Sequence, residues 1–226
     1  MVKNITFKLQ QMSTQTPTNR GLSQYLSVEL ERDPHGNVFA IKRPNYGCDA
    51  EDLDTTGFDY FDQNIGNHPF LRERFPRTKR GRDQKGIFFR QSWVRPNIGQ
   101  ENMAHPNNPA DFDPEQFQDP QDVKDVLMII RSTLKLFRGS LEDPKSGLEK
   151  GYGWYPEVSH PDSFVRGKYN GNVSDRIYIV DCNPFLPLEL NEANLATSKV
   201  VERVSSIALN NFGIGVEKMV PDLIIA

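Results

Sequence analysis

The most concentrated group of charged residues in the sequence is a block of arginines and lysines. Between Arg72 and Arg95, nine basic residues stand against two acids, a net charge of +7 in a chain whose total is −3. Arginine and lysine side chains bind phosphate and carboxylate oxygens, so this basic block is a candidate interaction site. Its members are Arg72, Arg74, Arg77, Lys79, Arg80, Arg82, Lys85, Arg90 and Arg95.

Three interpretations of the basic block are open. It could be a solvated loop that pairs with the acidic stretches 49–62 and 101–125, although exposed ion pairs stabilise by only about 0–1 kcal/mol each. It could bind other subunits, with the basic segment of one copy against an acidic face of the next. It could also bind DNA or RNA through the phosphates, with aromatic residues stacked on bases and the flanking acids opposing the approach of a polyanion. The candidate stacking residues are Phe75, Phe88, Phe89 and Trp93.

A second candidate site follows the apolar run 176–180. Asp181 and Asn183 stand two residues apart, and alternate residues of a strand point to the same side, so their oxygens could hold Mg²⁺ together. The segment Ile179-Val180-Asp181-Cys182-Asn183-Pro184 resembles the strand end of ATP-grasp enzymes, where an acid and an Asn hold the Mg²⁺ that bridges the nucleotide phosphates. The resemblance implies a Mg²⁺-nucleotide enzyme with upstream lysines on strands and a second metal-binding acid. The alternative is a buried strand that ends in a turn.

Other catalytic signals are absent from the sequence. It contains no glycine-rich phosphate loop, no Gly-x-Ser-x-Gly, no His-Glu-x-x-His and no Cys-x-x-Cys. The four histidines stand in turn-like contexts, and Cys48 and Cys182 are expected to be free thiols in a reducing compartment. We therefore expect no catalytic residue, no bound metal and no cofactor.

The elements that would position these residues can be read from periodicity. Residues 2–9 and 22–41 alternate as strands, and the turn Asp33–Asn37 predicts a hairpin over 26–41. The run 176–181 predicts a strand buried on both faces, and 216–225 a closing strand. Helical spacing predicts helices over 120–138 and 191–211.

The helix ends carry their own signals. Asp119 suits the N-cap and Pro120 the first turn of the first helix, while Gly139 is placed to end it. Gly213 and Gly215 are placed to end the second helix.

The amino-acid composition of the chain indicates how the chain is organised. Only 37% of the chain is apolar, below the common range of about 45–50%. Residues 43–119 lack periodicity, yet they carry aromatic residues that true disorder lacks. They predict an extended excursion with a few short strands, the best of them over 87–94, within a single domain, 1–226. No apolar run approaches the roughly 18 residues of a membrane span. We expect a protein of the cytoplasm or of a virion, not of a membrane.

These observations predict an α+β fold: a small mixed or antiparallel sheet, two main helices and long loops anchored by aromatic residues. They favour a non-enzymatic structural or assembly protein within an oligomer, such as a capsid, neck or tail component of a phage virion. Its partners would be other copies of itself or other subunits. The alternatives are a Mg²⁺-nucleotide enzyme that uses Asp181 and Asn183, and a nucleic-acid-binding protein that uses the basic block.

Overall fold

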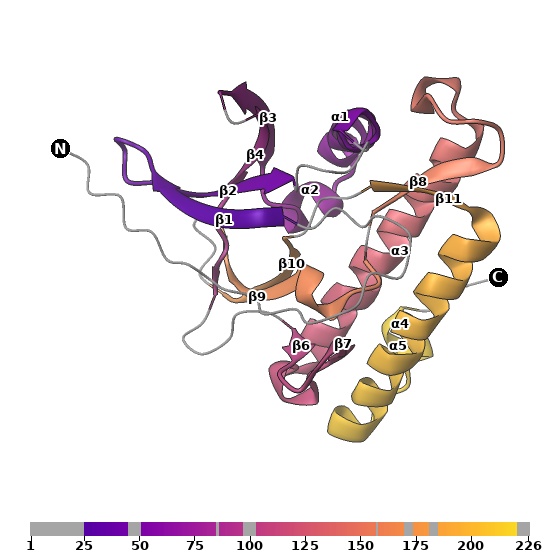
Figure 1. The fold of residues 1–226 in the computed structure, drawn as a ribbon. Helices are drawn as coiled ribbons and strands as arrows, with labels where there is room; N and C mark the ends of the chain where they lie inside the picture. The colour runs from indigo at the N-terminus through magenta and orange to yellow at the C-terminus, as the bar shows by residue number, and fades with distance from the viewer. Residues whose placement is uncertain are drawn as a thin grey trace. The chain divides into compact units, whose positions relative to one another are not determined.

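The computed structural model describes residues 25–44, 51–84, 86–96, 103–156, 158–169, 174–180 and 185–220 (Figure 1). The chain forms two compact units, the first from Met1–Leu53 and Pro76–Trp93 and the second from Asp54–Phe75 and Val94–Ala226. Helices and antiparallel sheets occur together, so the predicted α+β class is confirmed. The strand predicted over 2–9 lies outside the described residues, and the single domain stays a prediction.

The first unit contains a four-stranded antiparallel sheet in the order β1-β2-β4-β3. Its strands are β1 (Tyr25–Arg32), β2 (Val38–Pro44), β3 (Thr78–Asp83) and β4 (Gly86–Ser92). β1 and β2 form the predicted hairpin. In its turn the Asp33 carboxylate accepts hydrogen bonds from the backbone amides of His35 and Asn37, both at 2.9 Å. The turn chemistry read from the sequence therefore operates as expected.

The second unit is built on two long helices, α3 (Pro120–Glu142) and α4 (Leu190–Phe212). The shorter helices are α1 (Glu51–Asn67), which belongs to this unit from Asp54 onward, α2 (Leu71–Arg74) and α5 (Val216–Met219). Three small antiparallel sheets have the orders β10-β9-β5, β11-β8 and β6-β7. Their strands are β5 (Arg95–Pro96), β6 (Ala104–His105), β7 (Asn108–Phe112), β8 (Tyr152–Pro156), β9 (Phe164–Lys168), β10 (Arg176–Ile179) and β11 (Phe185–Glu189). Three single-turn 3-10 helices are η1 (Pro114–Gln116), η2 (Pro144–Ser146) and η3 (Pro161–Ser163) among the described residues.

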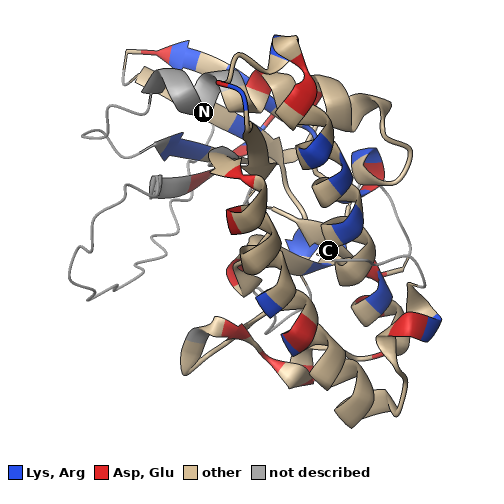
Figure 2. Cartoon of the chain, turned by 90° about the vertical axis from the view of Figure 1, so that its right-hand side faces the viewer, with Lys and Arg blue, Asp and Glu red and all other residues tan. Residues whose placement is uncertain are grey.

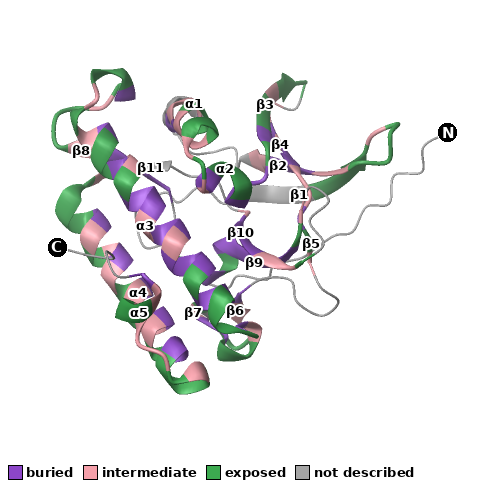
Figure 3. Ribbon diagram, turned by 180° about the vertical axis from the view of Figure 1, so that it is seen from behind, coloured by how far each residue is buried: buried purple, intermediate pink, exposed green. Residues whose placement is uncertain are grey.

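The core of the second unit lies between α3 and the strands packed on it. Ile177, Tyr178 and Ile179 are three consecutive residues of β10, and each is 0% exposed, so both faces of this strand are covered, as predicted. The inward side of α3 is equally buried at Val126, Ile130 and other positions of its apolar stripe (Figure 3). Burial of this kind contributes about 25 cal/mol per Å² of apolar surface, so this layer dominates the stability of the unit.

Both predicted helices are confirmed, with one correction at an end. Asp119 caps α3, accepting from the backbone amides of Gln121 and Asp122 at 2.8 and 3.1 Å. Gly139 does not end α3, which continues to Glu142. A tertiary contact explains the longer helix. The next residue, Ser140, is buried, and its Oγ accepts a hydrogen bond from the Trp154 amide at 2.8 Å. α4 ends at Gly213, whose φ of 67° is the left-handed cap that glycine supplies.

Three features of the fold differ from the sequence analysis. Within 43–119 the expected short strands are present, and the strand predicted over 87–94 is β4, but the helices α1 and α2 were not expected. The strands of 22–41 and 176–181 lie in separate sheets, because β10 pairs with its sequence neighbour β9. Residues Val216–Met219 form a helical turn rather than a strand, and 221–226 lie outside the described part.

Candidate interaction surface

Part of the basic block folds into a β-hairpin. β3 and β4 pair from Thr78–Gln91 to Asp83–Gly86, and the Ser92 amide extends the ladder by donating to the Arg77 carbonyl at 2.9 Å. Four cationic residues of this segment, Arg77, Lys79, Arg80 and Arg82, are exposed, and we call them the hairpin cations. Figure 2 colours the Lys and Arg residues of the chain blue and its acids red. The block is therefore a structured element, and the interpretation as a solvated loop does not apply to this segment.

The hairpin forms because its strands alternate. On β4, Ile87, Phe89 and Gln91 are 8%, 1% and 2% exposed, which fixes one face inward and sets the register. The amide of Gln91 donates to the hydroxyl of Thr78 across the strands at 3.2 Å. On the opposite face, a Cβ at Gly81 would lie 2.4 Å from the Phe88 ring, so glycine leaves the space that this ring occupies.

Two further arginines of this sheet hold its polar face together. Arg90 pairs with Glu31 at 3.0 Å and stands over the Phe39 ring at 3.4 Å from its centroid. Arg43, which lies outside the block, pairs with Asp83 at 2.6 Å, and its guanidinium lies 5.2 Å from the centroid of the Phe88 ring. Charge pairing and cation–π contact thus occupy both of these arginines and both carboxylates.

The aromatic residues of the block do not form a stacking platform. Phe75 and Phe89 are 6% and 1% exposed, so neither ring can receive a base. Phe88 lies between Arg43 and Gly81, and Trp93 is partly buried. The expectation of base stacking by these four residues is not supported, because Phe75 and Phe89 are buried and the Phe88 ring is in contact with Arg43 and Gly81.

The remaining basic residues of the block are placed elsewhere. Arg72, Arg74 and Arg95 belong to the second unit, and Lys85 lies outside the described residues. Arg74 is 8% exposed and pairs with Asp125 at 3.4 Å, while Arg72 and Arg95 are exposed. Of the nine predicted interaction residues, the first unit brings together the four hairpin cations and Arg90.

The acidic stretch 101–125 is largely engaged within the second unit. Asp111 pairs with Arg203 at 3.0 Å, and Asp113 caps η1 by accepting from the Glu115 amide at 3.1 Å. Asp119 and Asp122 form the capping box of α3. With Asp125 paired to Arg74, five of the six acids described in this stretch serve the fold. This stretch is therefore a poor candidate for the acidic face of a neighbouring copy.

A buried ion cluster joins α2, α3, β9 and β10. Arg166 meets both carboxylate oxygens of Asp122 at 3.2 Å and Asp175 at 3.1 Å. Arg176 lies 3.9 Å from Asp125, which also binds Arg74. Burial raises the pKa of Asp122, with the Gln118 amide and Arg166 opposing that effect. Sequence analysis missed the cluster, because Arg166 lies 44 residues from Asp122 and no local spacing signals the contact.

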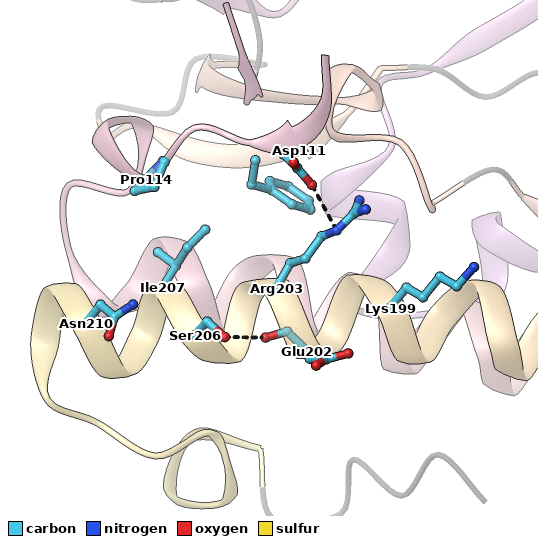
Figure 4. Close-up of a pocket in the computed structure, with 9 residues that line it drawn as sticks. Asp111, Pro114, Lys199, Glu202, Arg203, Ser206, Ile207 and Asn210 are labelled. Carbon is cyan, nitrogen blue, oxygen red and sulfur yellow. Dashed lines mark hydrogen bonds and ion pairs between the residues drawn. The ribbon is translucent and has the colours of Figure 1, made fainter. Parts of the chain in front are cut away.

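An open groove of about 510 Å³ lies between α4 and the segment of β7 and η1 (Figure 4). Its floor includes Phe112 of β7 and Ile207 of α4, which are 4% and 7% exposed. Charged side chains of both signs line it, with Arg203 pointing at Asp111 in the close-up. The groove combines apolar and ionic contacts and is open along the helix.

The predicted Mg²⁺ site cannot be placed. Asp181, Cys182, Asn183 and Cys48 all lie outside the described residues, and the enzyme hypothesis stays a prediction. Within the described part of the chain, no three His, Cys, Asp or Glu side chains gather closely enough to hold a metal ion. Among the helices of that same part, none is both long and apolar enough to cross a bilayer.

Comparison with known proteins gives no family. No protein-family model matches the sequence, and no curated protein matches it. A solved structure of an apo pseudokinase is similar over 90% of this chain and 74% of its own, with a TM-score of 0.43 and 8% sequence identity.

Proposed function

We propose that the protein is a non-enzymatic structural protein that acts as a subunit of an oligomer, in the cytoplasm or in a virion as a phage capsid, neck or tail component. The observation that supports this proposal best is the outer face of α4. Leu195 and Leu209 are 60% and 61% exposed, the highest values among the exposed large apolar side chains of the described residues. Large apolar side chains left exposed on one face of a helix are typical of a surface that another chain covers.

The spacing of these residues suits a second copy of the same helix. Leu195, Glu202 and Leu209 follow each other at intervals of seven residues, so they share one face of α4 over about 21 Å. In an antiparallel pair centred on Glu202, Leu195 of each copy meets Leu209 of the other. A two-fold contact needs this self-complementarity.

The charges on the same face fit that arrangement. Lys199 lies one turn before Glu202, so in an antiparallel pair each lysine approaches the glutamate of the other copy. The pair of lysine–glutamate contacts would offset the repulsion between the two glutamates at the centre. The contact would thus combine leucine burial at its ends with charge pairing in its middle.

Light scattering tests the proposal on the full chain at low and at high salt. We expect a multimer at both salt concentrations, because burial of leucine is not screened by ions. Leu195→Asn combined with Leu209→Asn should give a monomer with unchanged circular dichroism. The matched control is Leu30→Asn, which removes an exposed leucine of 39% exposure from β1 and should leave the mass unchanged.

The other outcomes are equally informative. A wild-type monomer at both salt concentrations would overturn the oligomer. A multimer that dissociates as salt rises would show that charge pairing, and not the burial of leucine, holds the subunits together. A multimer that persists at high salt after the double substitution would agree with the proposed oligomer, but it would show that this face of α4 is not the contact.

A further inference from the structure

We propose that the hairpin cations bind the phosphodiester backbone of a nucleic acid and do not read its bases. This inference does not depend on the oligomer proposed above, which uses α4. The group comprises Arg77, Lys79, Arg80 and Arg82, all exposed on one hairpin of the first unit.

The hairpin presents these charges at regular spacing. Arg80 and Arg82 are alternate residues of β3 and so project from the same face, while Lys79 projects from the other. From Arg77 to Arg82 the strand covers about 17 Å at roughly 3.3 Å per residue. The cations thus stand on both faces of β3, which is an edge strand of its sheet. A nucleic-acid strand carries a phosphate about every 3.4 Å of duplex axis, so a backbone that follows this edge can meet cations from both faces.

The local balance of charge favours an anionic partner. Between Pro76 and Trp93 the described residues include five basic side chains and a single acid, Asp83. Asp83 pairs with Arg43, and Glu31 on β1 pairs with Arg90, so neighbouring arginines outside the group neutralise these two carboxylates. The repulsion that these two acids would exert on a polyanion is therefore reduced.

The same sheet argues against base recognition. Phe89 is buried and Phe88 is covered by Arg43, so the rings that would stack on bases are occupied. Binding through phosphates alone predicts affinity that does not depend on sequence. It also predicts a steep dependence on salt, because each neutralised phosphate releases counterions.

An acidic protein segment is the competing partner, and the salt dependence separates the two. Four phosphate contacts give a slope of about −3.6 in a plot of log K against log salt for duplex DNA. Between 50 and 200 mM salt, the affinity should therefore fall by about 150-fold. Single-stranded DNA should give a slope of about −2.8.

Fluorescence anisotropy tests this on the full chain, with labelled duplex DNA of two unrelated sequences, duplex RNA and polyglutamate as probes. Deleting the block would remove β3 and β4, so the variant used is Arg80→Gln with Arg82→Gln. In the plot of log K against log salt, the slope for this variant should be less negative than that of the wild type by about 2, at about 1 per cation removed. The matched control is Lys135→Gln with Arg138→Gln, two exposed cations on α3, whose slope should equal that of the wild type.

Binding of both DNA sequences with equal affinity and the expected slope, reduced in the hairpin variant alone, is the expected result. Tighter binding of RNA than of DNA would identify the source of the phosphates and would agree with the proposal. The proposal would be overturned if no nucleic acid bound, if polyglutamate bound as tightly as DNA, or if the α3 control lost as much affinity as the hairpin variant. A clear preference for one DNA sequence would overturn backbone-only recognition.

Discussion

At the scale of single residues, we expect the stability of the fold to be most sensitive to substitutions in the buried ion cluster. Arg166 is 8% exposed, and it is the residue that pairs with both Asp122 and Asp175. Removing one partner of a buried pair leaves the other charged and desolvated, which costs about 3–5 kcal/mol. Arg166→Ala should therefore lower the free energy of unfolding in urea by that amount.

A matched exposed pair supplies the control. Arg203 and Asp111 pair at 3.0 Å with 40% and 44% of their side chains exposed. Arg203→Ala should cost no more than about 1 kcal/mol, because water screens and solvates such pairs. Equal costs for the two substitutions would show that the cluster around Arg166 is hydrated and not buried.

The raised pKa of Asp122 predicts how the stability of the protein depends on pH. Burial raises the pKa of its carboxyl above the ordinary value of 3.8, so the folded protein takes up the proton more readily than the unfolded chain. The contribution of this group to stability is then present below 3.8 and is lost as the pH rises through the folded-state pKa. Asp122→Asn removes the titration. Measured by urea unfolding, wild-type stability should fall relative to the variant as the pH rises, and a relative increase would mean that folding lowers this pKa instead.

Asp181 and Asn183 remain testable from the sequence alone. A ligand that binds only the folded state raises the melting temperature. If these residues hold a Mg²⁺-nucleotide, ATP with Mg²⁺ should raise the melting temperature of the wild type and not that of Asp181→Ala. Absence of a shift in the wild type would remove the enzyme hypothesis.

At the scale of elements, the sequence predicts what local chemistry decides. The cap at Asp119, the turn at Asp33 and the stop at Gly213 were all readable, because each acts on its immediate neighbours. α1 was missed, since its buried anchors Phe58 and Phe61 stand in a segment with little apolar periodicity. The ion cluster was missed for a related reason, because its partners meet only after β9 and β10 pair and pack on α3.

Two glycines should respond in opposite ways to alanine. A Cβ at Gly167 of β9 would lie 2.5 Å from the Arg95 carbonyl oxygen, so Gly167→Ala forces β5 away and should cost about 1–3 kcal/mol. A Cβ at Gly139 of α3 would meet nothing within 4 Å. Gly139→Ala should stabilise by about 0.5–1 kcal/mol, because alanine is the better helix former. Thermal unfolding measures both, and a stabilising Gly167→Ala would show that β5 does not approach β9 this closely.

At the scale of the whole molecule, the organisation could not be read from local patterns. The first unit is discontinuous: β2 pairs with β4 across the intervening segment Asp54–Phe75, which belongs to the second unit. Pairing of Arg95 with Lys168 likewise joins distant parts of the chain. Such long-range contacts depend on which apolar faces fit together, and the sequence shows each face without showing its partner.

The two units should differ in their resistance to local opening. In the first unit, the buried apolar side chains of β2 and β4 are few, such as Ala40 and Phe89, whereas α3 and β10 of the second unit belong to a larger layer of fully buried residues. A smaller core supports a lower free energy of opening. In native-state hydrogen exchange, the amides of β2 and β4 should therefore exchange before those of α3 and β10. Equal protection in both units would instead mean that they open together, which is the behaviour expected of the single domain predicted from the sequence.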